Sequence, residues 1–349
     1  MKSYCDLAGT RTQGPYIKSV LLYQLSYQIK HPFFKGSAKI RQKPIATNYL
    51  KKVFPQSVNQ FNNFFTNSGI TDLFLLIIFF MQDFFKNKVV VITGGSDGIG
   101  KALVDTLIPL GAKVATCARN QDKLYDLQLL HSGKSLHTMV ADVSSYNDCK
   151  NFIESTIEFY GGIDILINNA GISMRALVKD LDVEVIEKVM DINFKGTLYC
   201  TKLALDSIIE RKGSIVGVSS IAGYRGLPGR SGYSASKYAV TGFLEALRTE
   251  MMDSGVNVMW VCPGFTSSNI RNAALNKKGR SQGESPMDEG KMMSSVKCAE
   301  HILQAIEKRK RTLVLTFKGK QTVFLNRFFP SLADKLVKKF FFKNGELIR

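Results

Sequence analysis

Apolar and polar positions follow a regular pattern from Asn87 onward. Short runs rich in β-branched residues alternate there with segments of helical periodicity. The first run, KVVVIT, precedes a glycine-rich turn and a helix that Gly111 closes. Because strands alternate with helices, we expect βαβ units in a single doubly wound α/β domain, with a parallel sheet covered on both faces. The predicted strands are 88–93, 113–118, 136–143, 163–171, 213–220, 256–264 and 311–317.

Residues 1–80 lack this pattern and show neither helical nor strand periodicity. They carry ten Lys or Arg residues and only two acids. The longest apolar run, Leu73–Met81, is too short for a membrane-spanning helix, which needs about 20 residues. We therefore expect a poorly ordered or spurious leader with Met81 as a natural start, a domain over 81–320 and a tail over 321–349.

The predicted tail is basic and amphipathic. Its apolar residues recur near helical spacing, and Pro330 shortens the helix that they can form. Such a segment can cover a hydrophobic groove of its own domain, contact a second subunit or lie on an anionic membrane. Packing or dimer contact is favoured over lipid. The residues concerned are Leu325, Arg327, Phe328, Phe329, Leu332, Lys335, Leu336, Lys338, Lys339, Phe340 and Lys343.

Composition narrows the class of protein. The chain has 349 residues, of which 45% are hydrophobic and 22% charged, as is ordinary for a soluble globular protein. A net charge of +18 indicates an anionic partner, which could be nucleic acid, a membrane surface or a phosphorylated cofactor, or simply a solvated basic surface. The basic residues are dispersed and no nucleic-acid-binding motif is present, so no nucleic-acid partner is expected.

The cysteines argue against a metal site. Six Cys are scattered without a CxxC pair and only four His occur, so neither a metal centre nor a disulfide framework is expected. Isolated Cys residues usually pack as small apolar side chains, which favours a reducing compartment. We expect a cytoplasmic protein, with a membrane-peripheral location as the alternative.

Glycines in VVVITGGSDGIGKAL lie between the first predicted strand and the first predicted helix. Gly94 suits the tight turn, Gly98 lets the backbone approach a pyrophosphate, and Gly100 permits close packing of the helix on the sheet. The N-terminus of that helix offers free N–H groups and a partial positive charge to phosphates. A plain connection is the alternative, but strand, loop and helix together favour a dinucleotide site.

The end of the second strand indicates which dinucleotide binds. An NAD site usually places Asp or Glu there for the ribose hydroxyls, whereas an Arg accommodates the 2′-phosphate of NADP. The chain has Arg119 at this point and no acid before Asp122. NADP(H) is therefore favoured over NAD(H). Two observations weigh against it: Arg119 could be a plain surface residue, and Asp97 is an acid inside the glycine loop.

Tyr233 and Lys237 are four residues apart in GYSASKYAVTGFLEAL, so on a helix they share one face. A phenol titrates near pH 10, and a nearby ammonium favours its ionised form, so this Tyr can act as an acid or base toward a carbonyl or alcohol. Ser220 ends a predicted strand, where ligands gather in open α/β sheets, and its hydroxyl can polarise the same oxygen. Singly, each residue has an ordinary structural explanation.

Five motifs follow one another along the chain, each at a strand end: the glycine loop, NNAG, SS, YSASK and PG. With this order of motifs, the chain resembles the short-chain dehydrogenase/reductase family over roughly 86–310. The resemblance implies that Asn193 holds a water for proton relay and that Asp142 binds the adenine ring. The implied catalytic residues are Asn193, Ser220, Tyr233 and Lys237. The implied cofactor contacts, with Arg119 added from the strand end, are Gly94, Ser96, Gly98, Ile99, Gly100, Arg119, Asp142, Asn169, Ala170, Gly171, Tyr233, Lys237, Pro263, Gly264 and Thr266.

The resemblance implies a Rossmann-type sheet of about seven strands and reversible hydride transfer between NADP(H) and a carbonyl or alcohol substrate. It also implies a homo-oligomer. The segment PSLADKLVKKF resembles the branch of microsomal-type dehydrogenase/reductases and 3-ketosphinganine-reductase-like members. The alternative is a catalytically idle, dinucleotide-binding regulatory protein, against which the intact Ser220, Tyr233 and Lys237 argue.

The substrate is expected to be a bulky apolar ketone or its alcohol. The segment 270–293 is polar, long and glycine-containing, which indicates a mobile lid. An apolar pocket wall is expected around it, although Met residues are equally suited to filling a core. The candidates for this wall are Ile172, Met174, Tyr224, Leu227, Met287, Met292 and Met293.

Overall fold

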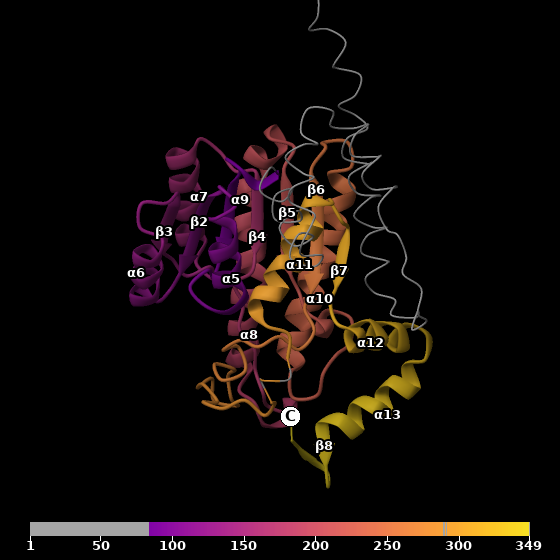
Figure 1. Ribbon diagram of the computed structural model, residues 1–349. Helices are drawn as coiled ribbons and strands as arrows, with labels where there is room; N and C mark the ends of the chain where they lie inside the picture. The colour runs from indigo at the N-terminus through magenta and orange to yellow at the C-terminus, as the bar shows by residue number, and fades with distance from the viewer. Residues whose placement is uncertain (1–83, 289, 291, 349) are drawn as a thin grey trace, which may run out of the picture. The chain divides into compact units, whose positions relative to one another are not determined.

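A seven-stranded parallel sheet forms the centre of the protein (Figure 1). The structure is a computed structural model and describes residues 84–348 apart from 289 and 291. The strand order is β3-β2-β1-β4-β5-β6-β7, which is that of a doubly wound, Rossmann-type sheet. The strands are β1 (Val89–Thr93), β2 (Lys113–Ala118), β3 (Leu136–Val140), β4 (Ile165–Asn168), β5 (Ser214–Val218), β6 (Asn257–Cys262) and β7 (Thr312–Val314).

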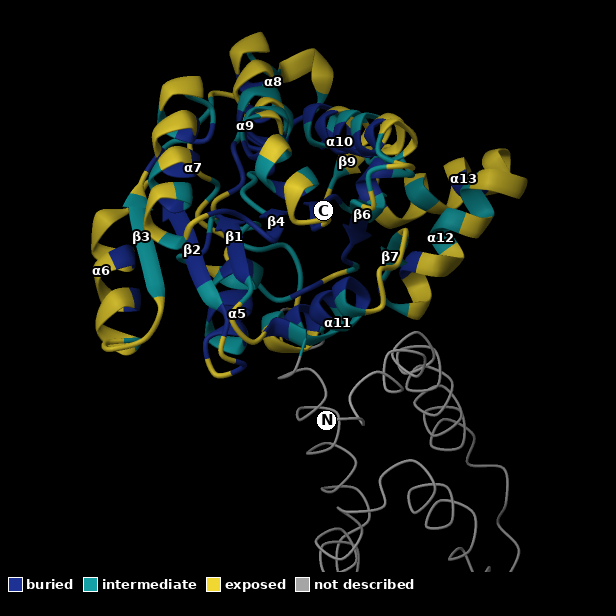
Figure 2. Ribbon diagram, turned by 90° about the horizontal axis from the view of Figure 1, so that it is seen from above, coloured by how far each residue is buried: buried dark blue, intermediate teal, exposed yellow. Residues whose placement is uncertain are grey.

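Helices cover both faces of this sheet (Figure 2). α5, α6 and α11 pack on one face, and α7, α9 and α10 on the other. The central strands are therefore buried on both sides, which explains their continuous apolar runs. The helices of the domain are α5 (Gly98–Leu107), α6 (Gln121–Leu130), α7 (Tyr146–Tyr160), α8 (Val183–Met190), α9 (Gly196–Glu210), α10 (Ser231–Glu250) and α11 (Ser295–Glu307). The shorter turns are η1 (Val178–Asp180), the π-helical η2 (Asp191–Lys195) and η3 (Ile221–Gly223).

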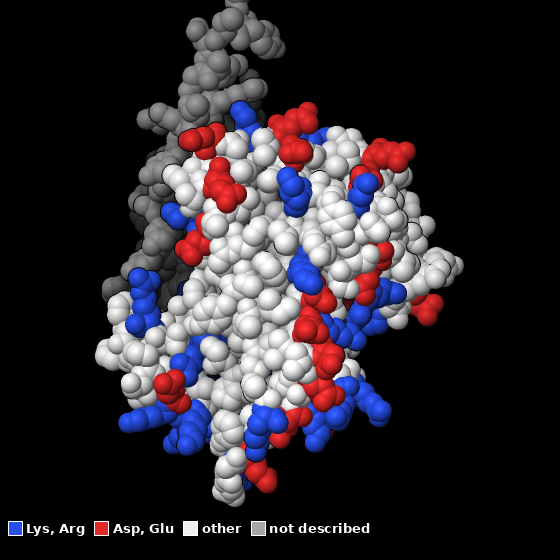
Figure 3. Space-filling view, turned by 180° about the vertical axis from the view of Figure 1, so that it is seen from behind, with Lys and Arg blue, Asp and Glu red and all other residues white. Residues whose placement is uncertain are grey.

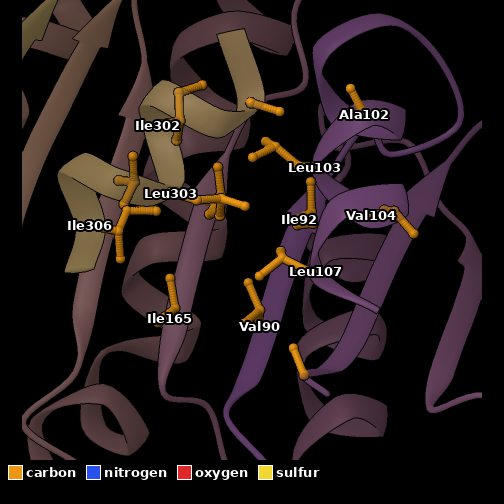
Figure 4. Packing of buried hydrophobic residues seen from close by; sticks show 14 of the residues in the cluster. Val90, Ile92, Ala102, Leu103, Val104, Leu107, Ile165, Ile302, Leu303 and Ile306 are labelled. Atoms are coloured by element: carbon orange, nitrogen blue, oxygen red, sulfur yellow. The ribbon is translucent and has the colours of Figure 1, made fainter. Parts of the chain in front are cut away.

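α11 packs against α5 and the central strands, although the two helices are far apart in the sequence (Figure 4). Leu303 and Ile306 of α11 lie near Leu107 of α5, above Val90 of β1. All four side chains are fully buried. Burial of a Leu or Ile side chain stabilises a fold by about 1.5–3 kcal/mol, so this contact anchors the end of the domain to its beginning.

Two C-terminal helices follow β7, and they lie beside the carboxyl ends of the strands (Figure 1). They are α12 (Phe317–Phe328) and α13 (Pro330–Phe341), and a short hairpin of β8 (Phe342–Lys343) and β9 (Glu346–Leu347) ends the chain. Pro330 occupies the first turn of α13, where its missing N–H costs no helical hydrogen bond. Among the described residues, no helix is both long and apolar enough to cross a bilayer.

The predicted fold class is confirmed, and all seven predicted strands are present. Five of them end two or three residues earlier than predicted: β3 ends at Val140, β4 at Asn168, β5 at Val218, β6 at Cys262 and β7 at Val314. The residues after β4 leave the ladder because the N–H groups of Asn169 and Ala170 donate to the Thr93 hydroxyl instead. The predicted leader and the apolar run Leu73–Met81 lie outside the described residues.

Candidate active site

The carboxyl ends of the strands open onto a cavity of about 860 Å³. Connections leave β1 and β4 in opposite directions, and ligands bind at such a switch point in open α/β sheets. The cavity is lined by the glycine loop, by residues that follow β2 to β6, and by α12 and α13. All of the predicted site residues line it except Gly100 and Asn193, which lie behind lining residues.

The glycine loop has the shape that a phosphate cradle requires. Gly94 and Gly98 have φ values of +70° and +56°, in the left-handed region that favours glycine. A Cβ at Gly100 would lie 2.1 Å from the Gly94 carbonyl oxygen, and a Cβ at Gly95 would lie 2.0 Å from the Thr116 hydroxyl oxygen. The loop therefore excludes side chains at these positions, and the N–H groups of Gly94 and Gly95 fix its position by donating to the Cys117 carbonyl.

Asp97 caps the helix that begins in this loop. Its carboxylate accepts a hydrogen bond of 2.7 Å from the Gly98 N–H and forms an ion pair with Lys123. The carboxylate therefore stabilises the positive N-terminus of α5, while Lys123 compensates its charge next to the phosphate cradle. The role of Lys123 was missed in the sequence, because a contact across 26 residues leaves no local signal.

Thr93 ties the NNAG segment to the end of β1. Its hydroxyl accepts hydrogen bonds of 3.0 Å from the N–H groups of Asn169 and Ala170. The Asn169 amide nitrogen donates to the carbonyls of Thr93 and Gly94 at 3.0 and 3.1 Å. NNAG thus holds the glycine loop in place, and Gly171 continues from it along the cavity wall.

Arg119 and Asp142 lie at the end of the cavity formed by β2 and β3. The Asp142 carboxylate accepts hydrogen bonds from the N–H and hydroxyl of Ser144, at 2.9 and 2.7 Å. Its second oxygen lies 3.7 Å from the Arg119 guanidinium, whose side chain is 56% exposed. A half-exposed guanidinium with a single, loose ion pair keeps donors available for an anionic group in the cavity.

Ser220, Tyr233 and Lys237 meet in the same cavity. Tyr233 and Lys237 lie on α10, with the ammonium nitrogen 5.7 Å from the centroid of the phenol ring. Tyr233 and Ser220, which follows β5, line the cavity together, and Ser220 is close enough to act on the pKa of the phenol. Burial raises the pKa of Tyr233, whereas the Ser220 side chain and the charge of Arg230 lower it. The phenol is therefore protonated at neutral pH and is positioned as a proton donor.

Asn193 lies behind this trio, in the π-helical turn η2. Its amide donates to the Ile172 carbonyl and the Ser236 hydroxyl, both at 2.9 Å, and its oxygen accepts from the Ile172 N–H at 2.8 Å. A Cβ at Gly171 would lie 3.1 Å from this oxygen and 3.3 Å from the Lys237 nitrogen. Gly171 thus leaves space between Asn193 and Lys237, while the amide itself fixes the cavity wall.

Lys237 is a buried cation. It is 4% exposed, and its ammonium donates a hydrogen bond of 2.8 Å to the Val218 carbonyl. Burial lowers the pKa of Lys237 from its usual 10.5 to about 8. Between these two values the unfolded chain binds more protons than the folded chain, so this residue's contribution to stability rises as the pH rises.

We expect this titration to be visible in the ligand-free protein. The free energy of unfolding of the wild type, minus that of Lys237→Met, should increase by about 3 kcal/mol between pH 7 and pH 11. Urea denaturation at several pH values measures the difference. Lys202→Met removes an exposed Lys and should leave the difference flat. A flat or falling difference for Lys237→Met would contradict the buried cation.

Pro263, Gly264 and Thr266 line the cavity beyond β6. Thr266 is buried, and its hydroxyl donates to the Gly264 carbonyl at 3.3 Å. Gly264 packs so closely on α12 that a Cβ there would lie 2.4 Å from the Thr316 hydroxyl oxygen. The segment after β6 therefore joins the cavity to the C-terminal helices.

The apolar wall differs from the predicted one. Ile172 and Leu227 line the cavity as expected, but Met174, Tyr224, Met287, Met292 and Met293 are absent from the described lining. Met174 is fully buried in a separate cluster with α8, and the Tyr224 hydroxyl instead accepts a hydrogen bond from Trp260. The C-terminal helices supply the wall that these residues were expected to form, through Leu325, Ala333, Leu336, Val337, Phe340 and Phe341.

Comparison with known families agrees with this geometry. A family model described as short chain dehydrogenase matches residues 88–279. The chain belongs to the short-chain dehydrogenase/reductase (SDR) family, as the resemblance predicted. Family member 7B of Rattus norvegicus is 36% identical over 73% of this chain and 81% of its own length. SDR family protein 7-like of Anopheles gambiae is 34% identical over 73% of this chain and 83% of its own length.

A solved SDR structure shares the fold. The short-chain dehydrogenase/reductase from Burkholderia phymatum, in complex with NAD, superposes with a TM-score of 0.64 over 71% of this chain and 95% of its own. The two sequences are 22% identical. The shared portion includes the sheet and the covering helices expected of an SDR.

Proposed function

We propose that this SDR interconverts a carbonyl and an alcohol, using NADP(H) in preference to NAD(H), with Tyr233 as the general acid and base. The main support is the meeting of Tyr233, Ser220 and Lys237 in one cavity with the glycine loop. The residues that would hold the dinucleotide fit it: the loop excludes side chains from the cradle, and Arg119 offers donors to a 2′-phosphate. When bound, NADPH supplies a hydride to the carbonyl carbon.

The proposed proton chemistry uses three side chains. The Tyr233 hydroxyl donates its proton to the carbonyl oxygen as the carbon accepts the hydride, which produces the alcohol and leaves a phenolate. The Ser220 hydroxyl orients the same oxygen, and the Lys237 ammonium stabilises the phenolate. Alcohol oxidation follows the reverse path, with the phenolate as the base. Asn193 acts as a positioning residue through the wall beside Lys237.

A panel of ketones and alcohols tests the activity directly. Long-chain and steroid-like compounds are included because the C-terminal helices make much of the cavity apolar. NADPH oxidation or NADP⁺ reduction is followed by nicotinamide absorbance. Turnover of at least one ketone supports the proposal. Tight NADPH binding without turnover across the panel would favour the alternative, a dinucleotide-binding protein with an idle site.

Arg119→Ala tests the cofactor preference. Loss of charge-assisted hydrogen bonds to a 2′-phosphate should raise the Kd of NADPH by about 10- to 100-fold, while the Kd of NADH changes little. NAD(H) is the alternative, since the Burkholderia phymatum structure holds NAD. Fluorescence titration gives both constants, and Arg280→Ala, an exposed Arg outside the described lining, is the matched control. Equal changes for both cofactors would contradict the preference.

The outer face of α12 and α13 is unusually apolar. Phe317, Phe324, Phe328, Phe329 and Leu332 are each at least 47% exposed. Lys335, Lys338 and Lys339 follow along α13, and Figure 3 shows basic side chains gathered toward the lower edge of the face seen there. We propose peripheral contact of this face with an anionic membrane; contact with a second subunit is the alternative.

Vesicle sedimentation separates these two occupants. The full chain should pellet with phosphatidylserine-containing vesicles and remain in solution with phosphatidylcholine alone, because the lysines need anionic lipid. Phe328→Ser/Phe329→Ser should lose pelleting, whereas Leu129→Ser/Leu130→Ser, an equally exposed pair on α6, should retain it. The membrane proposal fails if the full chain does not pellet with either kind of vesicle. If light scattering then shows a dimer for the full chain but a monomer for Phe328→Ser/Phe329→Ser, the face contacts a second subunit.

A further inference from the structure

Arg230 carries a guanidinium in the wall of the cavity, three residues before Tyr233. The residue is only 8% exposed. Its guanidinium carbon lies 5.6 Å from the centroid of the Phe341 ring. Within the part of the chain that the structure describes, no carboxylate pairs with this guanidinium and no oxygen accepts a hydrogen bond from it. Since Arg stays charged in proteins, a buried guanidinium without a partner indicates an anionic group in the cavity.

Other cations reinforce this positive region. Burial lowers the pKa of Arg230, and the charges of Arg175 and Arg271 lower it further. Arg175 is compensated by Glu284, at 3.0 Å, and Arg271 donates to the Thr266 carbonyl at 2.7 Å. Arg230 differs from both because, among the described residues, its guanidinium faces an aromatic ring rather than an oxygen. Its five N–H donors therefore remain for a ligand.

The surroundings of Arg230 belong to the substrate side of the cavity. A Cβ at the preceding Gly229 would lie 2.5 Å from Leu347 of the C-terminal hairpin, and the Gly229 carbonyl accepts from the Ala176 N–H at 2.9 Å. Phe341 ends α13. None of these neighbours belongs to the glycine loop or to the β2 and β3 ends, where the dinucleotide phosphates and adenine are expected.

The same wall is otherwise apolar. Leu325, Leu336 and Val337 line the cavity from α12 and α13. An apolar chain thus fits along the C-terminal helices, while an acidic group fits at Arg230, near the proton donor. A guanidinium suits either a carboxylate or a phosphate, because both accept its planar pair of N–H groups.

We infer that Arg230 binds the acidic group, a carboxylate or a phosphate, of an otherwise apolar ketone or alcohol and thereby places its carbonyl beside Tyr233. This inference rests on the proposed carbonyl chemistry and narrows its substrate class to anionic amphiphiles. The Phe341 ring lies against the guanidinium, so the C-terminal helices take part in recognition.

Matched pairs of ketones test the inference. One pair is 4-oxodecanoate and its methyl ester; the other is 2-oxododecyl phosphate and 1-hydroxydodecan-2-one. Rates with NADPH give the ratio of kcat/KM for the acidic member to that for the neutral member. The wild type should favour the acidic member by about 10- to 100-fold in at least one pair, and the pair with the larger ratio identifies the acidic group.

Variants assign this ratio to Arg230. Arg230→Met should bring the ratio close to one, whereas Arg230→Lys should keep part of it. Arg248→Met is the matched control, since Arg248 also stacks on an aromatic ring, 4.1 Å from the Trp260 centroid, but is absent from the described lining. A wild-type ratio near one, or the same ratio in wild type and Arg230→Met, would overturn the inference.

A binding measurement separates this inference from the proposed function. The Kd of decanoate, with decanamide as the neutral control, is measured by calorimetry in the presence of NADP⁺. Arg230→Met should raise the Kd of decanoate by about 10- to 100-fold. Decanoate binding that depends on Arg230, without turnover of any ketone, would support the anion site and reject the proposed activity. Ketone turnover without a preference for the acidic member would support the proposed activity and reject the anion site.

Discussion

Tyr233→Phe is expected to lower kcat by about 10²- to 10⁴-fold, the usual contribution of a general acid. The variant removes one hydroxyl from a ring that lies in the cavity beside Lys237. Affinity for NADPH should stay within about twofold, because the described hydrogen bonds of the glycine loop and NNAG do not involve this hydroxyl. Single-turnover rates of NADPH oxidation, with the ketone identified by the panel, measure the loss.

Tyr238→Phe is the matched control for this prediction. Tyr238 lies on the same helix, but it is 45% exposed and absent from the described cavity lining. Its hydroxyl can be removed without altering the Ser220 contact. Activity of Tyr233→Phe within tenfold of the control would reject Tyr233 as the proton donor and would direct attention to Ser220.

Gly100→Ala is expected to lower the affinity for NADPH by at least about 100-fold. The new methyl group would lie 2.1 Å from the Gly94 carbonyl oxygen and 2.5 Å from the Asn169 amide nitrogen. The first atom belongs to the glycine loop and the second to the NNAG segment that holds this loop, so both segments must shift to admit the methyl group. Overpacking of this kind typically costs about 1–3 kcal/mol of stability as well.

Gly242→Ala provides the comparison for Gly100→Ala. Gly242 lies in α10, and a Cβ there meets no atom within 4 Å. This variant should bind NADPH like the wild type and gain a little stability, because Ala favours a helix more than Gly. Fluorescence titration and thermal unfolding compare the two variants. Equal NADPH affinity for both would mean that the glycine loop does not hold the phosphates.

Local patterns were sufficient to predict the sheet and most of the dinucleotide side of the site. The glycine loop and NNAG follow directly after buried strands, so their position at the carboxyl edge could be inferred from neighbouring residues alone. The pairing of Tyr233 with Lys237 required only helical spacing. The family match then agreed with an order of motifs that was already visible in the sequence.

The substrate side could not be predicted in the same way. Val337 and Phe341 line the cavity although they lie about 100 residues beyond Tyr233 in the sequence. Local periodicity in the sequence cannot predict a contact between segments so far apart. The Met residues of 287–293 were expected in the wall, since their apolar side chains suited it, but the C-terminal helices occupy this place. Arg230 was overlooked within the catalytic stretch, because its importance depends on having no acidic partner among residues 84–348 as the structure describes them.

The π-helical turn at Asp191–Lys195 makes this part of the chain sensitive to deletion. α8, this turn and α9 follow one another without a break from Val183 to Glu210. A π-helical turn holds one residue more than an α-helical turn. Deleting one residue from it would let α8 and α9 join as a regular α-helix, so Cys200, Ala204 and Ile208 would stay against the sheet. The local backbone around Asn193 would change, however, and its amide would lose the contacts to Ile172. A one-residue deletion here therefore alters the site more than the fold.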